Sequence, residues 1–210
     1  MNEHLENLKE IRTMMERSSK FLSLSGLSGI SAGICALIGA YFVYTQTDID
    51  GIDQLYNADL RHEIVPFLVE IALSVLVSAL VFGIFFTVRK AKKQNLKVWN
   101  NTSKNLLISL AIPLLAGGMF CWGLLHHGLH LLCFPTTLVF YGVALVSASK
   151  FTVRDTFYLG IAEIILGIIA LFLAKYNLIF WAVGFGILHI IYGSVMYFKY
   201  DTAPKPPMGA

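Results

Sequence analysis

The chain has 210 residues, of which 56% are hydrophobic and 14% are charged, with a formal net charge of +3. A soluble domain carries about a quarter charged residues, and here the apolar residues also fall in long blocks, so the composition excludes an ordinary soluble protein and indicates a polytopic membrane protein. The three cysteines lie within or at the edges of these blocks, which excludes a secreted disulfide framework, and we expect no nucleic-acid partner.

Residues 1–20 are polar and precede the first apolar block. Leu5, Leu8 and Met15 recur at helical spacing, which predicts an amphipathic helix. Its acidic and basic residues are equal in number, so the segment is not a polybasic lipid anchor. The sequence leaves three roles open for it: lying on the inner leaflet, binding a cytoplasmic partner, or extending the first membrane span.

Six apolar blocks follow, each long enough to cross a hydrocarbon core about 30 Å thick. The third and fourth form one apolar run, which we divide at the sequence HHGLH (residues 126–130) because a glycine among histidines favours a tight turn at a water interface. The predicted spans are 21–45, 64–88, 105–125, 129–147, 156–174 and 177–198. The sequence therefore predicts an all-α fold, with one transmembrane domain over residues 21–198 and a disordered tail over 199–210.

Lysine and arginine are divided very unequally between the two sides of this arrangement. Of the 16 such residues, all but Arg61 and Lys175 fall on the side that holds both termini. The positive-inside rule places that side in the cytoplasm, and an even number of spans independently requires both termini on one side. We therefore expect a multi-pass protein of the inner or plasma membrane, in contact with the lipid bilayer and with both termini cytoplasmic.

The densest group of positive charges lies in the connection between the second and third spans, at residues 89–104. Such a loop can bind anionic lipid head groups. The same charges are also what topology alone requires, so both interpretations stay open.

A histidine-rich sequence, CWGLLHHGLHLLC, occupies residues 121–133 on the other side. Its imidazoles and thiols are ligand types that zinc and copper take, and a turn would bring its two ends together. The alternative is an interfacial turn whose cysteines act as small apolar side chains. The candidate metal ligands are Cys121, His126, His127, His130, Cys133 and, from the preceding outer loop, His62.

Two polar residues of the second span, Glu70 and Ser74, stand one helical turn apart. Glu70 lies about 9 Å below the outer end of that span. Together with the outer histidines, these residue types favour a second class of function, a metal-dependent membrane enzyme with its site on the outer face.

A repeated frame marks the last two spans. GIAEIILG at residues 160–167 and GILHIIYG at 186–193 share both glycines and all three isoleucines, and a looser copy, GLSGISAG, begins at Gly26. Positions i, i+3 and i+7 share one helix face, and small residues on that face let helices approach closely in lipid. The connection between these spans is short, so we expect antiparallel neighbours whose glycine stripes face each other, with Glu163 in contact with His189.

An ionisable side chain near the bilayer centre costs about 2.5–3.5 kcal/mol and usually faces a partner or a watery cavity. Glu163 and His189 lie about 10 and 13 Å from the inner ends of their spans. They predict a small membrane protein that transports a solute or conducts ions or protons through buried Glu and His side chains. A structural hydrogen bond would explain the pair equally well, and a non-catalytic subunit, a sensor or a homo-oligomer are further alternatives.

Overall fold

A computed structural model describes residues 25–47, 61–94 and 98–202 of the chain. The predicted helix at residues 1–20 and the tail from residue 203 lie outside these ranges. Within them every long element is helical, and six helices are long and apolar enough to cross a membrane. The predicted all-α fold with six candidate membrane spans is confirmed for this part of the chain.

The helices follow the order of the predicted spans. The first three are α2 (Gly26–Thr47), α3 (Arg61–Lys93) and α4 (Asn101–His126). The fourth consists of the 3₁₀ turn η2 (His130–Leu132), α5 (Cys133–Ala148) and the 3₁₀ turn η3 (Ser149–Phe151), and the fifth is α6 (Asp155–Phe172). The sixth runs through η4 (Ala174–Tyr176), α7 (Asn177–Trp181), the π-helix η5 (Ala182–Leu188), α8 (His189–Met196) and the π-helix η6 (Tyr197–Asp201).

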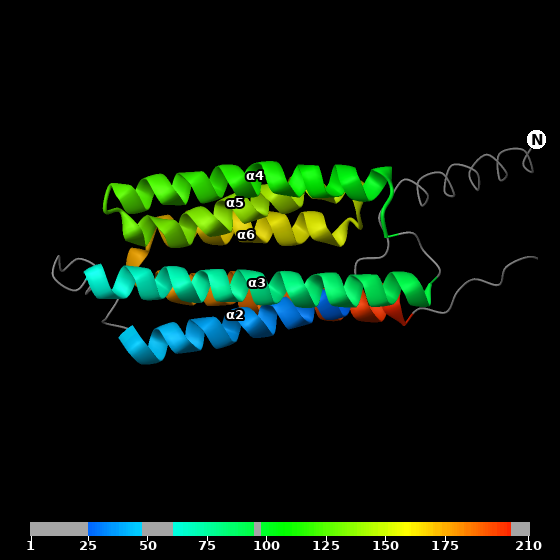
Figure 1. The fold of residues 1–210 in the computed structure, drawn as a ribbon, viewed down its shortest axis with the longest axis horizontal. Helices are drawn as coiled ribbons and strands as arrows, with labels where there is room; N and C mark the ends of the chain where they lie inside the picture. Colours follow the sequence, from blue (N-terminus) through cyan, green and yellow to red (C-terminus); the bar gives the residue numbers. More distant parts are fainter. Residues whose placement is uncertain (1–24, 48–60, 95–97, 203–210) are drawn as a thin grey trace, which may run out of the picture.

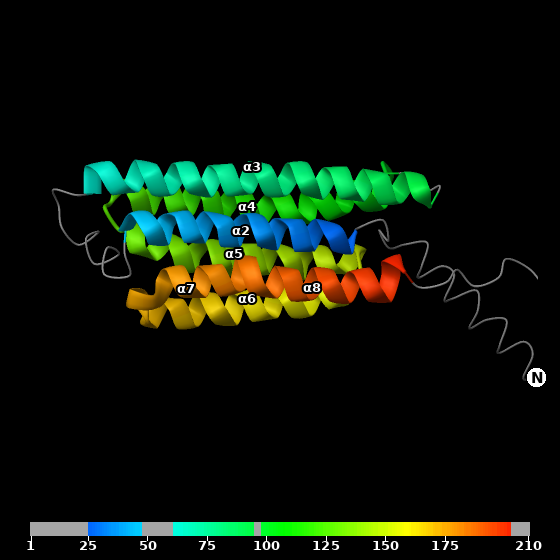
Figure 2. The same ribbon diagram turned by 90° about the horizontal axis from the view of Figure 1, so that it is seen from below.

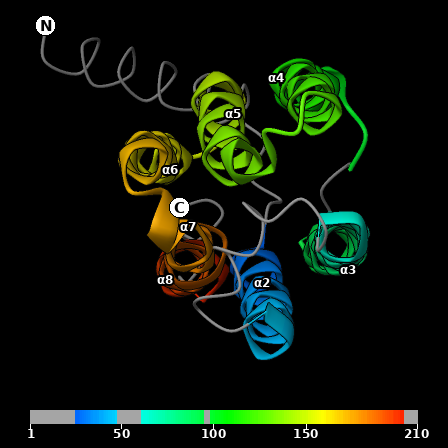
Figure 3. The same cartoon turned by 90° about the vertical axis from the view of Figure 1, so that its left-hand side faces the viewer.

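All six rods lie side by side along the long axis of the molecule (Figures 1 and 2). Seen from one end, they form an arc in the order α4, α5, α6, α8, α2 and α3 (Figure 3). The two helices that end the arc, α3 and α4, expose most of their large apolar side chains. Such apolar outer faces are what lipid-facing helices require.

The division of the long apolar run at HHGLH is confirmed. Helix α4 ends at His126, and Gly128 adopts a φ of 74°, a left-handed conformation that glycine reaches without steric cost. We call this end of the bundle the histidine end. The opposite end, where α3 ends and α4 and α6 begin, is called the basic end, because Lys90, Lys104 and Arg154 lie there.

Two of the predicted spans end earlier than the helices do. The second helix continues past residue 88 to Lys93, and the last continues past residue 198 to Asp201. A buried ion pair explains both extensions, because Lys90 Nζ lies 2.6 Å from Asp201 Oδ1. The other oxygen of Asp201 accepts hydrogen bonds from Ser25 Oγ and from the Gly26 N–H, both at 3.0 Å, so the start of α2 is tied to the same carboxylate.

The glycine stripes do not face each other as expected. A Cβ added at Gly160 would lie 2.8 Å from the Gly142 carbonyl oxygen of α5, whereas one added at Gly193 would lie 2.6 Å from the Gly26 carbonyl oxygen of α2. Helix α6 therefore packs closely on α5, and α8 on α2. The looser copy of the frame in α2 is thus the partner of the copy in α8.

Cysteine labelling tests the predicted orientation of these helices. In a variant lacking the three native cysteines, Gln94→Cys at the basic end should react with an impermeant thiol reagent only from the cytoplasmic side. Leu129→Cys, which is 49% exposed at the histidine end, should react only from the opposite side. Reaction of both positions from one side would contradict the six-span topology.

Candidate functional site

Glu163 and His189 meet inside the bundle. Glu163 lies on α6 and is completely buried, and His189 is the first residue of α8 and is nearly so. The closest approach is 3.5 Å, between Glu163 Oε1 and His189 Nδ1. At that separation the two groups attract each other electrostatically, but they do not form a hydrogen bond of ordinary length.

Gly184 makes room for the glutamate. A Cβ at this position would lie 2.5 Å from Glu163 Oε2 and 2.5 Å from Leu138 Cδ2, so only glycine lets the backbone approach the carboxyl group this closely. Gly184 belongs to the π-helix η5, which ends immediately before His189. Short π-helical segments inside α-helices occur frequently at functional sites.

Both ring nitrogens of His189 have partners, and one of them fixes the tautomer. Nδ1 lies 2.9 Å from the carbonyl oxygen of Gly184, which can only accept, so Nδ1 must carry a hydrogen. Nε2 lies 2.8 Å from the hydroxyl of Tyr141 on α5. In the neutral ring Nε2 therefore accepts a hydrogen bond from the Tyr141 hydroxyl, and in the imidazolium it donates one to the same oxygen.

Unlike the imidazole of His189, the carboxyl group of Glu163 has no hydrogen-bond partner of its own among the described residues. Both of its oxygens are nevertheless buried. A buried carboxylate that serves only to join helices normally accepts several hydrogen bonds, because an unsatisfied buried charge is costly. The pair therefore combines a fully bonded imidazole with a carboxyl group that has spare capacity for a proton or a cation.

Aromatic rings surround the histidine on its other sides. The ring of Tyr141 lies 5.3 Å from that of His189, and the Phe185 ring stacks on the imidazole at 6.0 Å. Trp181 continues the cluster, with its ring 5.0 Å from Phe185. Phe185 and Trp181 precede His189 in the last helix, on its side toward the histidine end of the bundle.

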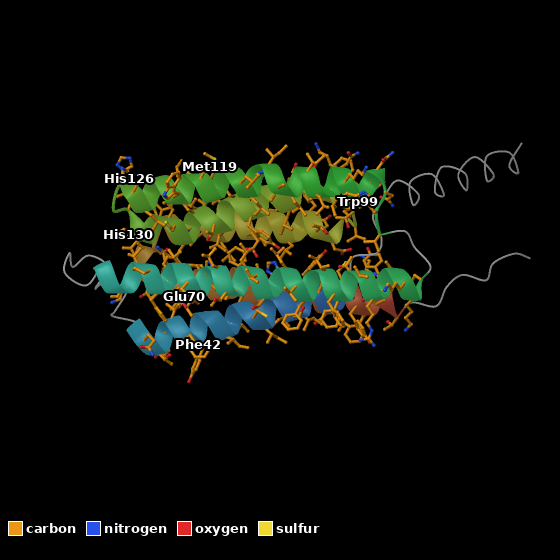
Figure 4. All side chains as sticks on the ribbon, viewed as in Figure 1. Phe42, Glu70, Trp99, Met119, His126 and His130 are labelled. Atoms are coloured by element: carbon orange, nitrogen blue, oxygen red, sulfur yellow. The ribbon has the colours of Figure 1, made fainter. Side chains whose placement is uncertain are left out.

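The structure distributes the predicted metal ligands around the α4–α5 hairpin. Cys121 and Cys133 face each other across it, each sulfur approaching the other residue's carbonyl oxygen, at 4.0 and 3.7 Å. The exposed rings of His126 and His127 contact each other, and His126 projects away from the bundle while His130 lies on the opposite side of the hairpin (Figure 4).

The described residues contain no group of three or more His, Cys, Asp or Glu side chains placed to hold a metal ion. The side chain of His62 lies outside the described part of the chain, so the zinc or copper site stays a prediction. Glu70 and Ser74 share the exposed face of α3, where they line a shallow surface groove. Figure 4 shows Glu70 on this helix. The two residues are not brought near Glu163 or His189.

Sequence reasoning missed Tyr141 and Gly184. Tyr141 lies in an apolar block without any repeated frame, and its nearness to His189 follows only from the packing of α5 on α6. Gly184 had one visible signal, the closely spaced glycines of the sequence GFG just before His189. The π-helix that positions it has no recognisable sequence signature.

Comparison of the chain with protein-family models, with curated proteins and with solved structures gives no match. The function must therefore be argued from the geometry of the site. Its two informative features are the six candidate membrane helices and the buried Glu163–His189 ion pair.

Proposed function

We propose that this chain is a small integral membrane protein that conducts protons, or transports a solute together with protons, through the Glu163–His189 pair. The observation that supports this proposal is the carboxyl group of Glu163, which is completely buried and accepts no hydrogen bond from the described residues. A group that only joins two helices gains nothing from being left unsatisfied, whereas a group that must take up and release a proton needs this freedom.

The imidazole of His189 suits the transfer step. A proton that arrives at Nε2 converts the ring to an imidazolium, whose charge is balanced by the Glu163 carboxylate 3.5 Å away. Release of the Nδ1 proton to Oε1 then leaves a neutral ring and a neutral carboxylic acid. One proton has in effect crossed the ring, which now carries its hydrogen on Nε2 and must return to the Nδ1 tautomer before the next transfer.

Proton flux into vesicles tests this proposal. Purified protein is reconstituted in vesicles that contain a pH-sensitive dye, and flux is driven by a pH gradient. We expect Glu163→Gln and His189→Gln each to abolish the protein-dependent flux, because glutamine keeps the size and polarity of either group but cannot carry a proton at neutral pH. Thermal unfolding of each variant shows whether the protein still folds.

A structural hydrogen bond predicts a different pattern. Both single variants would then lose stability, the double variant would lose less than the sum of the two, and flux would follow the amount of folded protein. Unchanged flux in folded Glu163→Gln would overturn the proposal. Loss of flux in Glu70→Gln but not in Glu163→Gln would place the site on α3 instead.

A further inference from the structure

We infer that protons reach the Glu163–His189 pair from the basic end of the bundle, along the hydroxyl groups of Tyr141 and Tyr192, while aromatic rings close the route from the histidine end. This inference rests on the proposed function and adds the access path to the same site. It assigns roles to Tyr141 of α5 and Thr156 of α6, which lie outside the repeated frame, and to Tyr192, which lies within its second copy.

The first link joins His189 to Tyr141. The Tyr141 hydroxyl lies 2.8 Å from Nε2, the ring nitrogen that the Gly184 carbonyl leaves without a hydrogen. Tyr141 can give its hydroxyl proton to Nε2 while it takes another proton on the same oxygen. The phenol therefore passes on one proton and ends unchanged, provided a second donor lies within reach.

The proposed path assigns that role to Tyr192, whose hydroxyl is the next one on α8. Tyr192 follows His189 by one helical turn on α8, in the direction of the basic end. Its hydroxyl lies 2.8 Å from Thr156 Oγ1 on α6, and either oxygen can be the donor. Because both hydroxyls donate and accept, this pair can receive a proton on one side and release one on the other.

Asp155 and Tyr200 form the mouth of the path at the basic end. The Tyr200 hydroxyl donates to Asp155 Oδ2 at 2.7 Å, and Asp155 directly precedes Thr156, the hydrogen-bond partner of Tyr192. Lys199 Nζ lies 3.0 Å from each oxygen of the same carboxylate, and its side chain is 54% exposed. The carboxylate is thus placed between an exposed charge and the buried hydroxyls, where it can take protons from water.

The histidine end offers a different environment. Phe185 stacks on His189 and lies 5.0 Å from both Tyr141 and Trp181, ring centre to ring centre. A phenylalanine ring neither donates nor accepts a proton. The nearest buried polar side chain toward that end, Asn177, donates its amide to the Leu131 carbonyl oxygen at 2.9 Å. An amide does not titrate, so it cannot continue the path.

Removal of single hydroxyl groups tests the path in the vesicle assay. Tyr192→Phe and Tyr141→Phe each delete one oxygen and keep the ring, so each should slow proton flux by about tenfold or more, as expected for the loss of a proton-transfer group. Tyr158→Phe is the matched control, because Tyr158 lies at the same end of α6 but is 58% exposed on the outer surface. It should leave the flux unchanged.

A side-specific block tests the direction of access. In the variant without native cysteines, Tyr200→Cys should lose flux when a charged, impermeant methanethiosulfonate is added at the basic end. Leu129→Cys, at the histidine end, should react without loss of flux.

The outcomes separate the two proposals. If Glu163→Gln abolishes flux but Tyr141→Phe and Tyr192→Phe conduct like the parent, the path is wrong and the site stands. If Tyr158→Phe slows flux as much as Tyr192→Phe, or if only Leu129→Cys is blocked, the path is also wrong. If Glu163→Gln conducts normally, the proposed function itself fails.

Discussion

Replacing Asp201 with asparagine should lower the free energy of unfolding by about 3–5 kcal/mol, because it removes the carboxylate from a buried ion pair. Lys90 and Asp201 are only 8% and 11% exposed, and their charged atoms lie 2.6 Å apart. Asp201 also accepts from Ser25 and from the first N–H of α2, so its loss affects three helices at once. Chemical unfolding in detergent micelles measures the change.

Asp155→Asn provides the comparison. Its partner Lys199 is 54% exposed, and an exposed ion pair contributes at most about 1 kcal/mol. The double variant Lys90→Met/Asp201→Asn should be less damaged than the sum of its single changes, since it removes both members of the buried ion pair. Equal effects of Asp201→Asn and Asp155→Asn would show that the buried pair does not stabilise the fold.

Gly193→Ala should lower the free energy of unfolding by about 1–3 kcal/mol, the usual cost of overpacking. The added methyl group would lie 2.5 Å from the Ile30 nitrogen and 2.6 Å from the Gly26 carbonyl oxygen. Both are backbone atoms, which cannot rotate away as a side chain can. Helices α2 and α8 must therefore separate to admit the methyl group.

Gly83→Ala is the matched control on α3, where nothing lies within 4 Å of the added atom. Here alanine should leave stability unchanged or raise it by up to about 1 kcal/mol, because it favours the helix. Thermal unfolding of the two variants side by side gives the comparison. A Gly193→Ala protein as stable as Gly83→Ala would mean that the close approach of α2 and α8 is not needed.

The sequence was sufficient to predict the spans and the Glu163–His189 contact. Long apolar blocks determine helices in lipid, and a short connection makes consecutive spans neighbours. The helix against which each glycine stripe packs could not be predicted in the same way. A period of 3.6 residues shows that Gly160 and Gly167 share a face, but it does not show which neighbouring helix lies against it.

The remaining parts of the candidate site depend on contacts between distant segments. Tyr141 reaches His189 because α5 packs on α6, and Gly184 meets Glu163 because a π-helix changes the register of the last span. At the hairpin the turn was predicted correctly. The directions of its histidine side chains depend on where α4 ends and on the left-handed residue Gly128, and neither follows from ligand types alone.

The position of Asp201 has a consequence for biosynthesis. Among the described helices α2 is made first, yet the carboxylate that binds its first N–H belongs to the last residue of the last helix. The face of α2 that carries Gly26 and Gly29 also packs on residues of α8. During synthesis α2 can pair with α3, but its second partner enters the membrane only when translation of the bundle is nearly complete. A ribosome that stalls before α8 therefore leaves an intermediate with this glycine face uncovered, and such an intermediate is what membrane quality control would encounter.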